Sequence, residues 1–408
     1  MIREVPIPGA EDFDDVESLL ALAASPGIRP GLERVGRLLE LLGNPQNDYP
    51  ALHVVGTNGK GSTCAFLESV LRAAGYRTAF YSSPHLESPG ERLLIAGRPL
   101  DADRWMAAVQ KTVGAVRGDS LLEADPPSYF EIVTAAAFCL ASEERADVAV
   151  VEAGLGGRLD ATNLLGDVAC SVVASVSMDH SEYLGDTLEK IAREKFAVVR
   201  PGVPACYLGD NAGLIPLFKS FCGRAGALPH VVSEEFEPVN VRVTDCGSSF
   251  DFVGKNLSLR DIRIRMVGRY QVSNAALALS VLERTWDRFP RLTPEGVRKG
   301  MEAAFWPGRL EVVRKAPLVL LDGGHNEDGV RKLVESVREL WPDRRVGIVY
   351  AAMRDKEYGA CLSLLQGLSP ALYATAVPGL SRSFEPAGLL TAAEGLAWRN
   401  TPCPFDSP

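Results

Sequence analysis

The sequence predicts an α/β protein of two domains, in which a mostly parallel sheet covered by helices on both faces is followed by a smaller α/β domain. Three observations lead to this fold class. Short apolar runs alternate with helical stretches along most of the chain. One apolar run is joined to a helix by a glycine-rich turn, as in a βαβ unit. The chain has 408 residues, which is more than one hydrophobic core usually supports.

The first domain is predicted from the elements near its start. Residues 31–42 place leucine and valine at helical spacing, and Gly43-Asn44-Pro45 ends that helix. The elements expected next are a strand, a helix and three strands, at residues 52–55, 63–74, 78–81, 148–151 and 169–176. Continuous apolar runs of this kind are typical of strands buried on both faces, so we expect a parallel sheet between helices.

The rest of the chain is predicted to form an appended β region, a helix and the second domain. Residues 203–265 are less regular and contain short alternating runs, at 239–243 and 257–266, that suit extra strands. The elements expected later are a helix at 271–284 and second-domain strands at 318–321, 346–350 and 371–376. We expect the domains to comprise residues 1–307 and 308–408, with a site in the cleft between them.

Composition and charge narrow the class of protein. The formal net charge is −9, which gives no uniform attraction for nucleic acid or anionic lipid. The acidic start lacks the features of a signal peptide, and no apolar stretch approaches the roughly 20 residues of a membrane helix. The 8 cysteines are dispersed without a C-x-x-C pair, which favours reduced thiols. We expect a soluble, cytoplasmic monomer that binds small molecules, and neither nucleic acid nor membranes.

The strongest chemical signal is a glycine-rich turn between a predicted strand and a predicted helix, Gly56-Thr57-Asn58-Gly59-Lys60-Gly61-Ser62-Thr63. Amides at a helix N-terminus attract anions, so the turn and Lys60 are expected to hold ATP phosphates. The pattern departs from the usual P-loop, because Gly61 follows Lys60 and no glycine lies five residues before Gly59. The alternative is a plain glycine turn with a surface lysine, but the order of strand, glycines, lysine, hydroxyls and helix favours phosphate binding.

A carboxylate and a second glycine-rich loop follow the next buried strand. Glu152 ends the apolar run that begins at residue 147, and residues 153–163 have the sequence AGLGGRLDATN. A strand-end carboxylate beside a phosphate loop suits Mg²⁺, which prefers oxygen ligands and bridges protein to nucleotide. The glycines allow a ligand to approach the backbone closely. The alternative is a strand-end acid followed by a flexible loop.

Other polar groups lie at predicted strand ends, and each is ambiguous alone. Ser83 lies in a Ser-Ser-Pro-His segment, where its hydroxyl suits a metal but where a turn is also common. His180 follows Asp179 after the third strand and suits either a ligand or a hydrogen-bonded structural histidine. Asp322 and His325 occupy a similar place in the second domain.

Three more candidates come from helices and from the domain junction. Lys195 lies in the Arg-Glu-Lys run of a helix predicted at 187–199, which by default is a solvated helix face. Arg309 and Asn274 are polar groups that suit a nucleotide in the cleft, although Arg309 is equally compatible with a surface position.

The ordered motifs together resemble the Mur ligases, and more narrowly the folylpolyglutamate synthase/dihydrofolate synthase family, from the opening helix to about residue 360. The matching stretches are HVVGTNGKGST, YSSPHLESPGERLLI, SYFEIVTAAAF, VVEAGLGGRLDATN, SMDHSEYLGDTLEKIAREK, GRYQVSNAALAL, PGRLEV, LDGGHN and AAMRDKE. The resemblance implies a Mur-ligase-like fold, with a P-loop ATP-binding domain and a smaller C-terminal α/β ligase domain.

The resemblance also implies roles for individual residues. ATP is expected to be held by Thr57, Asn58, Gly59, Lys60, Gly61, Ser62, Asn274, Arg309, Asp322 and His325. Mg²⁺ is expected at Ser83, Glu152, His180 and Lys195, the last being where the family carries a carbamylated lysine. The pterin substrate is expected at Phe130, Asp160 and Ala161. The catalytic residues among these are Lys60, Lys195 and His180.

The activity implied is ATP-dependent ligation of L-glutamate to dihydropteroate, to a reduced folate, or to both, through an acyl phosphate. Some segments depart from the family pattern: DGGHNE stands for DGAHNP, EKFAVVR stands for an EKAGI-type run, and the tail after residue 380 leaves the glutamate site unassigned. The alternatives are a folylpolyglutamate synthase alone, a cell-wall ligase, against which GLGGRLDATN and SPHL argue, and a P-loop protein that binds ATP as a regulatory switch.

Overall fold

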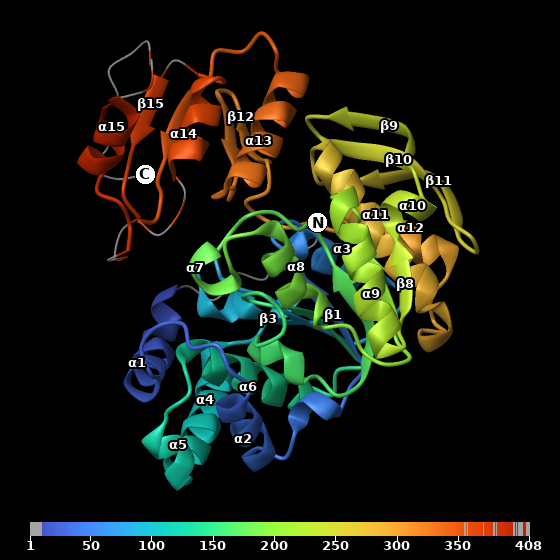
Figure 1. The fold of residues 1–408 in the computed structure, drawn as a ribbon, viewed down its shortest axis with the longest axis vertical. Coiled ribbons are helices and arrows are strands. Elements are labelled where there is room, and N and C mark those ends of the chain that lie inside the picture. The colour runs from blue at the N-terminus through green and yellow to red at the C-terminus, as the bar shows by residue number, and fades with distance from the viewer. Residues whose placement is uncertain are drawn as a thin grey trace.

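The computed structural model describes residues 10–354, 356, 358–369, 371–377, 380, 382–394, 396, 398 and 403–404. A large sheet between layers of helices forms most of the molecule, and the elements after residue 308 gather at one end of it (Figure 1).

The large sheet has eight strands in the order β4-β3-β2-β5-β1-β6-β7-β8. Neighbouring strands from β2 to β8 run parallel, whereas β3 and β4 are added antiparallel at one edge. The strands are β1 (Ala51–Val55), β2 (Thr78–Tyr81), β3 (Leu93–Ile95), β4 (Arg98–Pro99), β5 (Val148–Glu152), β6 (Val168–Val173), β7 (Pro204–Tyr207) and β8 (Leu228–Val231). Because β1, β5 and β6 are buried along their whole length, their sequences are continuously apolar. The predicted parallel sheet is confirmed.

Helices cover both faces of this sheet. Successive side chains of a strand point to opposite sides, so each strand contributes side chains to a core on either face. On one face, Leu52 and Val54 join a core with α3 (Lys60–Ala73), α11 (Arg269–Arg284) and α12 (Pro294–Ala303). On the other face, Ala51 and Tyr81 join a core with α1 (Asp14–Ala23), α2 (Glu33–Leu41), α4 (Ala102–Arg117) and α6 (Tyr129–Glu143). A third core unites β6 and β7 with α8 (Leu188–Phe196) and α9 (Ile215–Ala225).

Shorter helices connect these layers. The α-helical ones are α5 (Ser120–Ala124), α7 (Ser181–Leu184) and α10 (Val232–Glu235). The 3-10 turns are η1 (Ala10–Phe13), η2 (Pro45–Asn47), η3 (Pro89–Arg92), η4 (Ala161–Leu164), η5 (Ala212–Leu214) and η6 (Trp286–Arg288).

The appended β region is a separate antiparallel sheet. It has the order β11-β10-β9 and consists of β9 (Val239–Thr244), β10 (Gly247–Val253) and β11 (Ser258–Ile264). Phe250 and Ile262 point into the core shared with α11, whereas alternate residues of β11 are exposed. The extra strands predicted at 239–243 and 257–266 are present; β11 has one buried face and one in water, whereas the alternate residues Val241 and Val243 of β9 are only partly buried.

The C-terminal elements form two small sheets. β12 (Glu311–Lys315) and β13 (Leu318–Leu321) pair antiparallel, and β14 (Gly347–Tyr350), β15 (Ala371–Ala374) and β16 (Cys403–Pro404) pair in parallel. The helices are α13 (Glu327–Leu340), α14 (Tyr358–Gln366) and α15 (Pro386–Glu394). The strands predicted at 318–321, 346–350 and 371–376 are present, but the first pairs with β12 and lies in a different sheet from the other two.

Two element boundaries differ from the predicted ones beside the glycine-rich turn at residues 56–63, which is called the phosphate turn below after its predicted role. α3 starts at Lys60, three residues before the predicted start, because the turn leads directly into the helix. β6 ends at Val173, before the predicted residue 176, because Ser175 bonds the backbone of Thr57 instead of a neighbouring strand.

Two features of the described residues bear on the expected class of protein. The part of the chain that the structure describes has no helix long and apolar enough to span a membrane. Seven cysteines of this part are free thiols, namely Cys64, Cys139, Cys170, Cys206, Cys222, Cys246 and Cys361.

Candidate active site

The glycine-rich turn is anchored by the chain that follows β6. Thr57 N donates to Ser175 O at 2.7 Å, and Asn58 N donates to Ser175 Oγ at 3.1 Å. The hydroxyl of Thr57 donates to Ser177 O at 3.0 Å and accepts from Ser177 N at 3.1 Å. These bonds occupy the amides of Thr57 and Asn58. The amides left to face a ligand are those at the start of α3.

The start of α3 has the features that suit an anion, and α11 supports it. The first amides of a helix have no partner within it, and they attract negative charge. Gly59 precedes them with a φ of 83°, and a Cβ there would lie 2.4 Å from Asn274 Oδ1, so only glycine fits. Asn274 Nδ2 donates to Gln271 Oε1 at 3.0 Å, and Gln271 Nε2 donates to Ser62 Oγ at 3.1 Å. The Asn274 side chain thus packs against Gly59 and supports the turn.

Lys60 and Glu152 meet beside this helix end. Lys60 Nζ donates to Thr57 O at 3.2 Å and lies 3.9 Å from Glu152 Oε1. Glu152 is the last residue of β5 and is 6% exposed. Burial raises the pKa of Glu152, while Lys60, Arg309 and the amide of Ser83 act in the opposite direction. The Glu152 carboxylate is therefore surrounded by positive groups. A cation that binds this carboxylate would share it with them.

Ser83 and Glu152 suit a magnesium ion that is shared with a nucleotide. The backbone amide of Ser83 is directed at the Glu152 carboxylate, so the two residues are neighbours at one edge of the sheet. Within the described ranges, no three His, Cys, Asp or Glu side chains gather closely enough to hold a metal by themselves. Mg²⁺ in nucleotide sites commonly takes one or two protein oxygens and fills its shell with phosphate oxygens and water. The hard oxygen donors present fit that kind of binding.

His180 faces the C-terminal domain. Its backbone has a φ of 50°, and its Nε2 lies 3.1 Å from Lys356 Nζ. Burial, with Lys356, His325 and Lys60, lowers the pKa of His180 to about 4, although Asp179 opposes the shift. The neutral ring accepts a hydrogen bond from the Lys356 ammonium. No hydrogen bond or ion pair among the described residues joins His180 to Glu152.

Asp179 contacts three residues of the C-terminal domain. Lys356 Nζ donates to its Oδ1 at 2.7 Å, while Asn326 Nδ2 at 3.1 Å and His325 Nε2 at 3.5 Å approach its Oδ2. Burial alone would raise the pKa of Asp179, but the hydrogen bonds from His325 and Lys356 and the nearby charges hold it well below its usual range. An ionised Asp179 therefore links the two parts of the molecule.

Asn58 makes the second polar link between these parts. Its side chain exchanges two hydrogen bonds of 3.0 Å with Asn326, and its Nδ2 also donates to Asp328 Oδ2 at 2.9 Å. Asn326 caps the start of α13, and Asp328 lies in its first turn. The phosphate turn thus touches the C-terminal domain directly.

Lys195 is buried at 3% exposure, so the default expectation of a solvated helix face is wrong for this residue. Its Nζ donates to Gly56 O, at the start of the phosphate turn, at 2.9 Å. Burial and the charge of Lys60 lower the pKa of Lys195 to about 7, against the effects of Asp179 and Asp160. The neutral amine is therefore far more populated near neutral pH than it is in an exposed lysine.

Asp160 organises the second glycine-rich loop. Its Oδ2 accepts from Leu155 N at 2.7 Å, and its Oδ1 accepts from Thr162 N at 3.0 Å. A Cβ on Gly154 would lie 2.6 Å from the ring of Phe130, so that loop and ring are in close contact. Ala161 is buried beside Asp160. The three residues predicted at the pterin therefore lie on this loop, as Asp160 and Ala161 do, or on the helix that packs against it, as Phe130 does.

The second-domain candidates mainly shape the junction. Asp322 Oδ2 accepts from Leu310 N and Oδ1 accepts from Gly324 N, both at 2.8 Å, and burial raises its pKa. Arg309 Nη1 donates to Gly308 O at 3.3 Å. His325 is about half exposed and bonds Gly323 O through Nδ1 at 3.0 Å.

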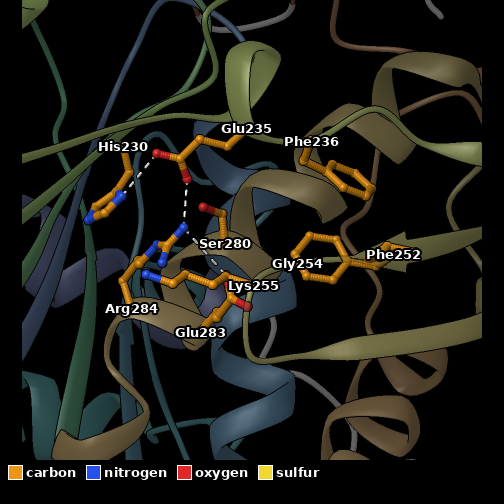
Figure 2. A pocket seen from close by; sticks show the side chains of 10 residues that line it. His230, Glu235, Phe236, Phe252, Gly254, Lys255, Ser280, Glu283 and Arg284 are labelled. Carbon is orange, nitrogen blue, oxygen red and sulfur yellow. Dashed lines mark hydrogen bonds and ion pairs between the residues drawn. The ribbon is translucent and has the colours of Figure 1, made fainter.

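A cavity of about 480 Å³ lies away from these groups, between α10, β10 and α11 (Figure 2). None of the predicted site residues lines it. In Figure 2 its charges mostly face one another: Arg284 bonds Glu235 at 2.6 Å and lies 3.5 Å from Glu283, and His230 bonds Glu235 at 3.1 Å. Glu283 also accepts from the amide of Leu257 at 2.8 Å. These contacts fasten a loop to α11 and explain the cavity as a structural junction.

Several residues at the site had no predicted role. They are Ser175, Asp179, Gln271, Asn326, Asp328 and Lys356. Asp179, Gln271, Asn326 and Lys356 lie inside the motifs quoted above, which was the available signal. Their partners lie far away in sequence, and a motif does not reveal contacts between domains.

Comparisons with known proteins agree with this arrangement. Residues 54–282 match the Mur ligase middle domain, and residues 308–400 match the Mur ligase glutamate ligase domain. The dihydrofolate synthase/folylpolyglutamate synthase of Bacillus subtilis is 34% identical over 365 residues, covering 88% of this chain and 84% of that protein. The Mycobacterium tuberculosis folylpolyglutamate synthase complexed with ADP superposes with a TM-score of 0.90 at 30% identity, covering 97% of this chain and 89% of that one.

A further solved structure, a folylpolyglutamate synthase with AMPPCP and folate, gives a TM-score of 0.85 at 27% identity and covers 97% of both chains. The middle-domain match alone spans more than half of the sequence. The chain therefore belongs to the folylpolyglutamate synthase/dihydrofolate synthase family of Mur ligases, and is an ATP- and Mg²⁺-dependent ligase that forms a carbon–nitrogen bond.

Proposed function

We propose that this chain joins L-glutamate to the carboxylate of dihydropteroate and also to the terminal carboxylate of a reduced folate. One observation supports this most directly. The segment from Glu152 to Thr162 begins beside Lys60, at the phosphate end, and continues as the glycine loop that packs on Phe130. A single segment thus connects the proposed phosphate site to the proposed pterin site, as an enzyme that phosphorylates the carboxylate of a pterin substrate requires.

The chemistry follows from this placement. A carboxylate oxygen of the pterin substrate attacks the γ-phosphorus of ATP, the bond to ADP breaks, and an acyl phosphate forms. The glutamate amine then attacks the acyl carbon, loses a proton and expels phosphate. Lys60 and the first amides of α3 stabilise charge on the transferring phosphoryl group. Bound Mg²⁺ supplies further charge neutralisation at the phosphates.

The proposed ligands of Mg²⁺ are Ser83, Glu152, His180 and Lys195. For His180 to take part, its Nε2 must exchange the Lys356 ammonium for the metal. Thr57 to Ser62, Asn274, Arg309, Asp322 and His325 are proposed at the nucleotide. Of these, Asp322 acts by fixing backbone, because both of its carboxylate oxygens accept from main-chain amides, whereas Asn274 Nδ2 donates to the Gln271 side chain. Phe130, Asp160 and Ala161 are proposed at the pterin.

Lys195 is proposed to be carbamylated. Only a neutral amine adds CO₂, and the lowered pKa of about 7 makes that form abundant near neutral pH. The product is an anionic oxygen donor, which suits a hard cation where an ammonium does not.

Two further proposals concern organisation. Residues 1–307 and 308–408 are proposed as the domains, a division supported by the start of β12 at Glu311 and by polar links concentrated at Asn58 and Asp179. The protein is proposed to act as a cytoplasmic monomer on small molecules, without nucleic acid or membrane partners. The free thiols of the seven cysteines from Cys64 to Cys361 support a reducing location.

Glutamate-dependent ADP release tests the proposal. We expect the purified chain to release ADP when ATP, Mg²⁺ and L-glutamate are combined with dihydropteroate, and separately with tetrahydrofolate. Release with tetrahydrofolate alone would reduce the function to a folylpolyglutamate synthase. ATP binding without release in either mixture would instead favour a regulatory ATP-binding protein.

A further inference from the structure

A buried polar chain connects β1 to the glycine loop of the substrate site. His53, in the middle of β1, has no exposed surface, and its Nε2 lies 2.8 Å from Thr162 Oγ1. Thr162 Oγ1 lies 2.5 Å from Asp160 Oδ1. All three side chains are buried away from water. Each proton of these hydrogen bonds is therefore carried by one of these nitrogen or oxygen atoms.

The geometry fixes the direction of these hydrogen bonds. The amides of Leu155 and Thr162 both donate to Asp160, and this stabilises its ionised form against the burial that raises its pKa. An ionised Asp160 can only accept, so the Thr162 hydroxyl donates to it. The same hydroxyl must then accept from His53, which places the ring proton on Nε2.

The opposite arrangement is more costly. It would need a protonated Asp160, a Thr162 hydroxyl that points at the ring, and a proton on Nδ1. Nδ1 is buried without a hydrogen-bond partner among the described residues. A buried donor without a partner is rarer and costlier than a buried acceptor without one. Burial lowers the pKa of His53 to about 3, so a doubly protonated ring is also excluded at neutral pH.

Core packing does not account for this histidine. The neighbours of His53 along β1 are apolar, and an apolar side chain there would avoid the cost of the unpartnered Nδ1. The feature that an apolar side chain cannot supply is the Nε2 proton. That proton holds the Thr162 hydroxyl in the one orientation that serves Asp160.

We propose that His53 is a positioning residue for substrate binding: through Thr162 it completes the donor set of Asp160, and Asp160 shapes the glycine loop against Phe130. This rests on the proposed function for the identity of the substrate that the loop meets. His53 lies on β1, the strand that leads into the phosphate turn. From there it fixes the part of the proposed pterin site that contains Phe130. The prediction is a selective effect on the pterin substrate.

Steady-state kinetics of a small set of variants test this role. We expect His53→Leu to raise KM for dihydropteroate about five- to tenfold, the worth of one buried hydrogen bond, with KM for ATP changed less than about twofold. His53→Gln keeps a donor and should restore most of the affinity. Thr162→Val should raise the same KM, and the double variant should be no worse than Thr162→Val, because both changes break one chain. Ser171→Ala is the control, since Ser171 pairs in register with His53 but bonds Val198 O.

Equal increases in both KM values, or additive effects of His53→Leu and Thr162→Val, would overturn the role. A measurement on the wild type without substrate separates this from a failure of the proposed function. With ¹⁵N-labelled histidine, His53 should carry its proton on Nε2 alone between about pH 5.5 and 8, given its low pKa. A proton on Nδ1 would refute the proposed hydrogen-bonded chain from His53 through Thr162 to Asp160, even if ligation is observed. If the Nε2 tautomer is present but no pterin-dependent ADP release is observed, the proposed function is refuted while the hydrogen-bonded chain from His53 to Asp160 is retained.

Discussion

The edge of the large sheet that is proposed to hold phosphate and the contact with the C-terminal domain are built differently. At the sheet edge, Lys195 and Glu152 are buried, and their partners lie on neighbouring strands and turns of one core. At the domain contact, Lys356 and the half-exposed His325 reach Asp179 across the junction visible in Figure 1. The first region is preformed by burial, whereas the second depends on a few polar bonds. Nucleotide binding and ligation should therefore respond separately to mutation.

Lys60→Ala should give the largest effect. Among the described residues its ammonium pairs with Thr57 O and Glu152, and its loss should slow ADP formation about 10²- to 10³-fold through lost charge stabilisation. The melting temperature should change by less than about 3 °C, because no core contact is lost. Lys299→Ala, on an exposed part of α12, is the control. ADP formation at the wild-type rate would show that the turn does not act on phosphate.

Lys195→Ala comes next and tests the buried edge from its other side. Ligation should fall by about 10²-fold, in the range seen when one stabilising group is removed from an active site, while ATP binding measured by calorimetry persists. Acetate should restore part of the activity by occupying the vacated carboxylate position. Turnover at the wild-type rate would rule out a ligand role for Lys195, whatever its modification state.

The same residue predicts a pH dependence. The pKa of Lys195 is lowered to about 7, so the neutral amine that adds CO₂ increases as pH rises through about 7. In bicarbonate buffer, activity should rise from pH 6 to 8, and ¹³C NMR with labelled bicarbonate should detect a carbamate signal that Lys195→Ala lacks. A rise in activity of the same size without bicarbonate, with no carbamate signal, would contradict the modification.

Asp179→Asn tests the domain contact. The Asp179 and Lys356 side chains are 9% and 13% exposed, and the substitution leaves the ammonium without its carboxylate. We expect kcat for ligation to fall about tenfold or more, with affinity for ATP largely unchanged, because one partner of a buried pair is costly to lose. A double-mutant cycle with Lys356→Ala should show strong coupling. Independent effects of the two changes would mean that the pair does not join the domains during turnover.

The sequence predicts the sheet edge well because its signals are local. Strand, glycine turn, lysine and helix follow one another between residues 51 and 73, and Glu152 ends its own apolar strand. Burial on both faces makes those strands apolar throughout, so their positions are visible without knowledge of the fold. The glycines are explained by contacts, as at Gly59 against Asn274.

The domain contact was not predictable in the same way. Asp179, Asn326 and Lys356 are ordinary polar residues, and their meeting depends on how two domains are placed. Lys195 shows the opposite error, because a charged residue in a helix suggests a solvated face until the fold buries it against Gly56. Helix periodicity could have helped, since Ile191 lies four residues earlier and is also buried.

The smallest expected effect concerns the packing of α12 against α3, the helix that begins at Lys60. In α12, a Cβ on Gly300 would lie 2.4 Å from Val70 Cα and 2.9 Å from Ser69 O, both backbone atoms of α3. Gly300→Ala should therefore destabilise the protein by about 1–3 kcal/mol, as overpacking does in well-packed cores. Gly114→Ala, in α4, meets nothing within 4 Å and should stabilise by up to about 1 kcal/mol through helix propensity. Urea unfolding of both variants measures the contrast. Because α3 carries Lys60, Gly300→Ala should also weaken ATP binding slightly, and an unchanged stability would show that the two helices are able to move apart without cost.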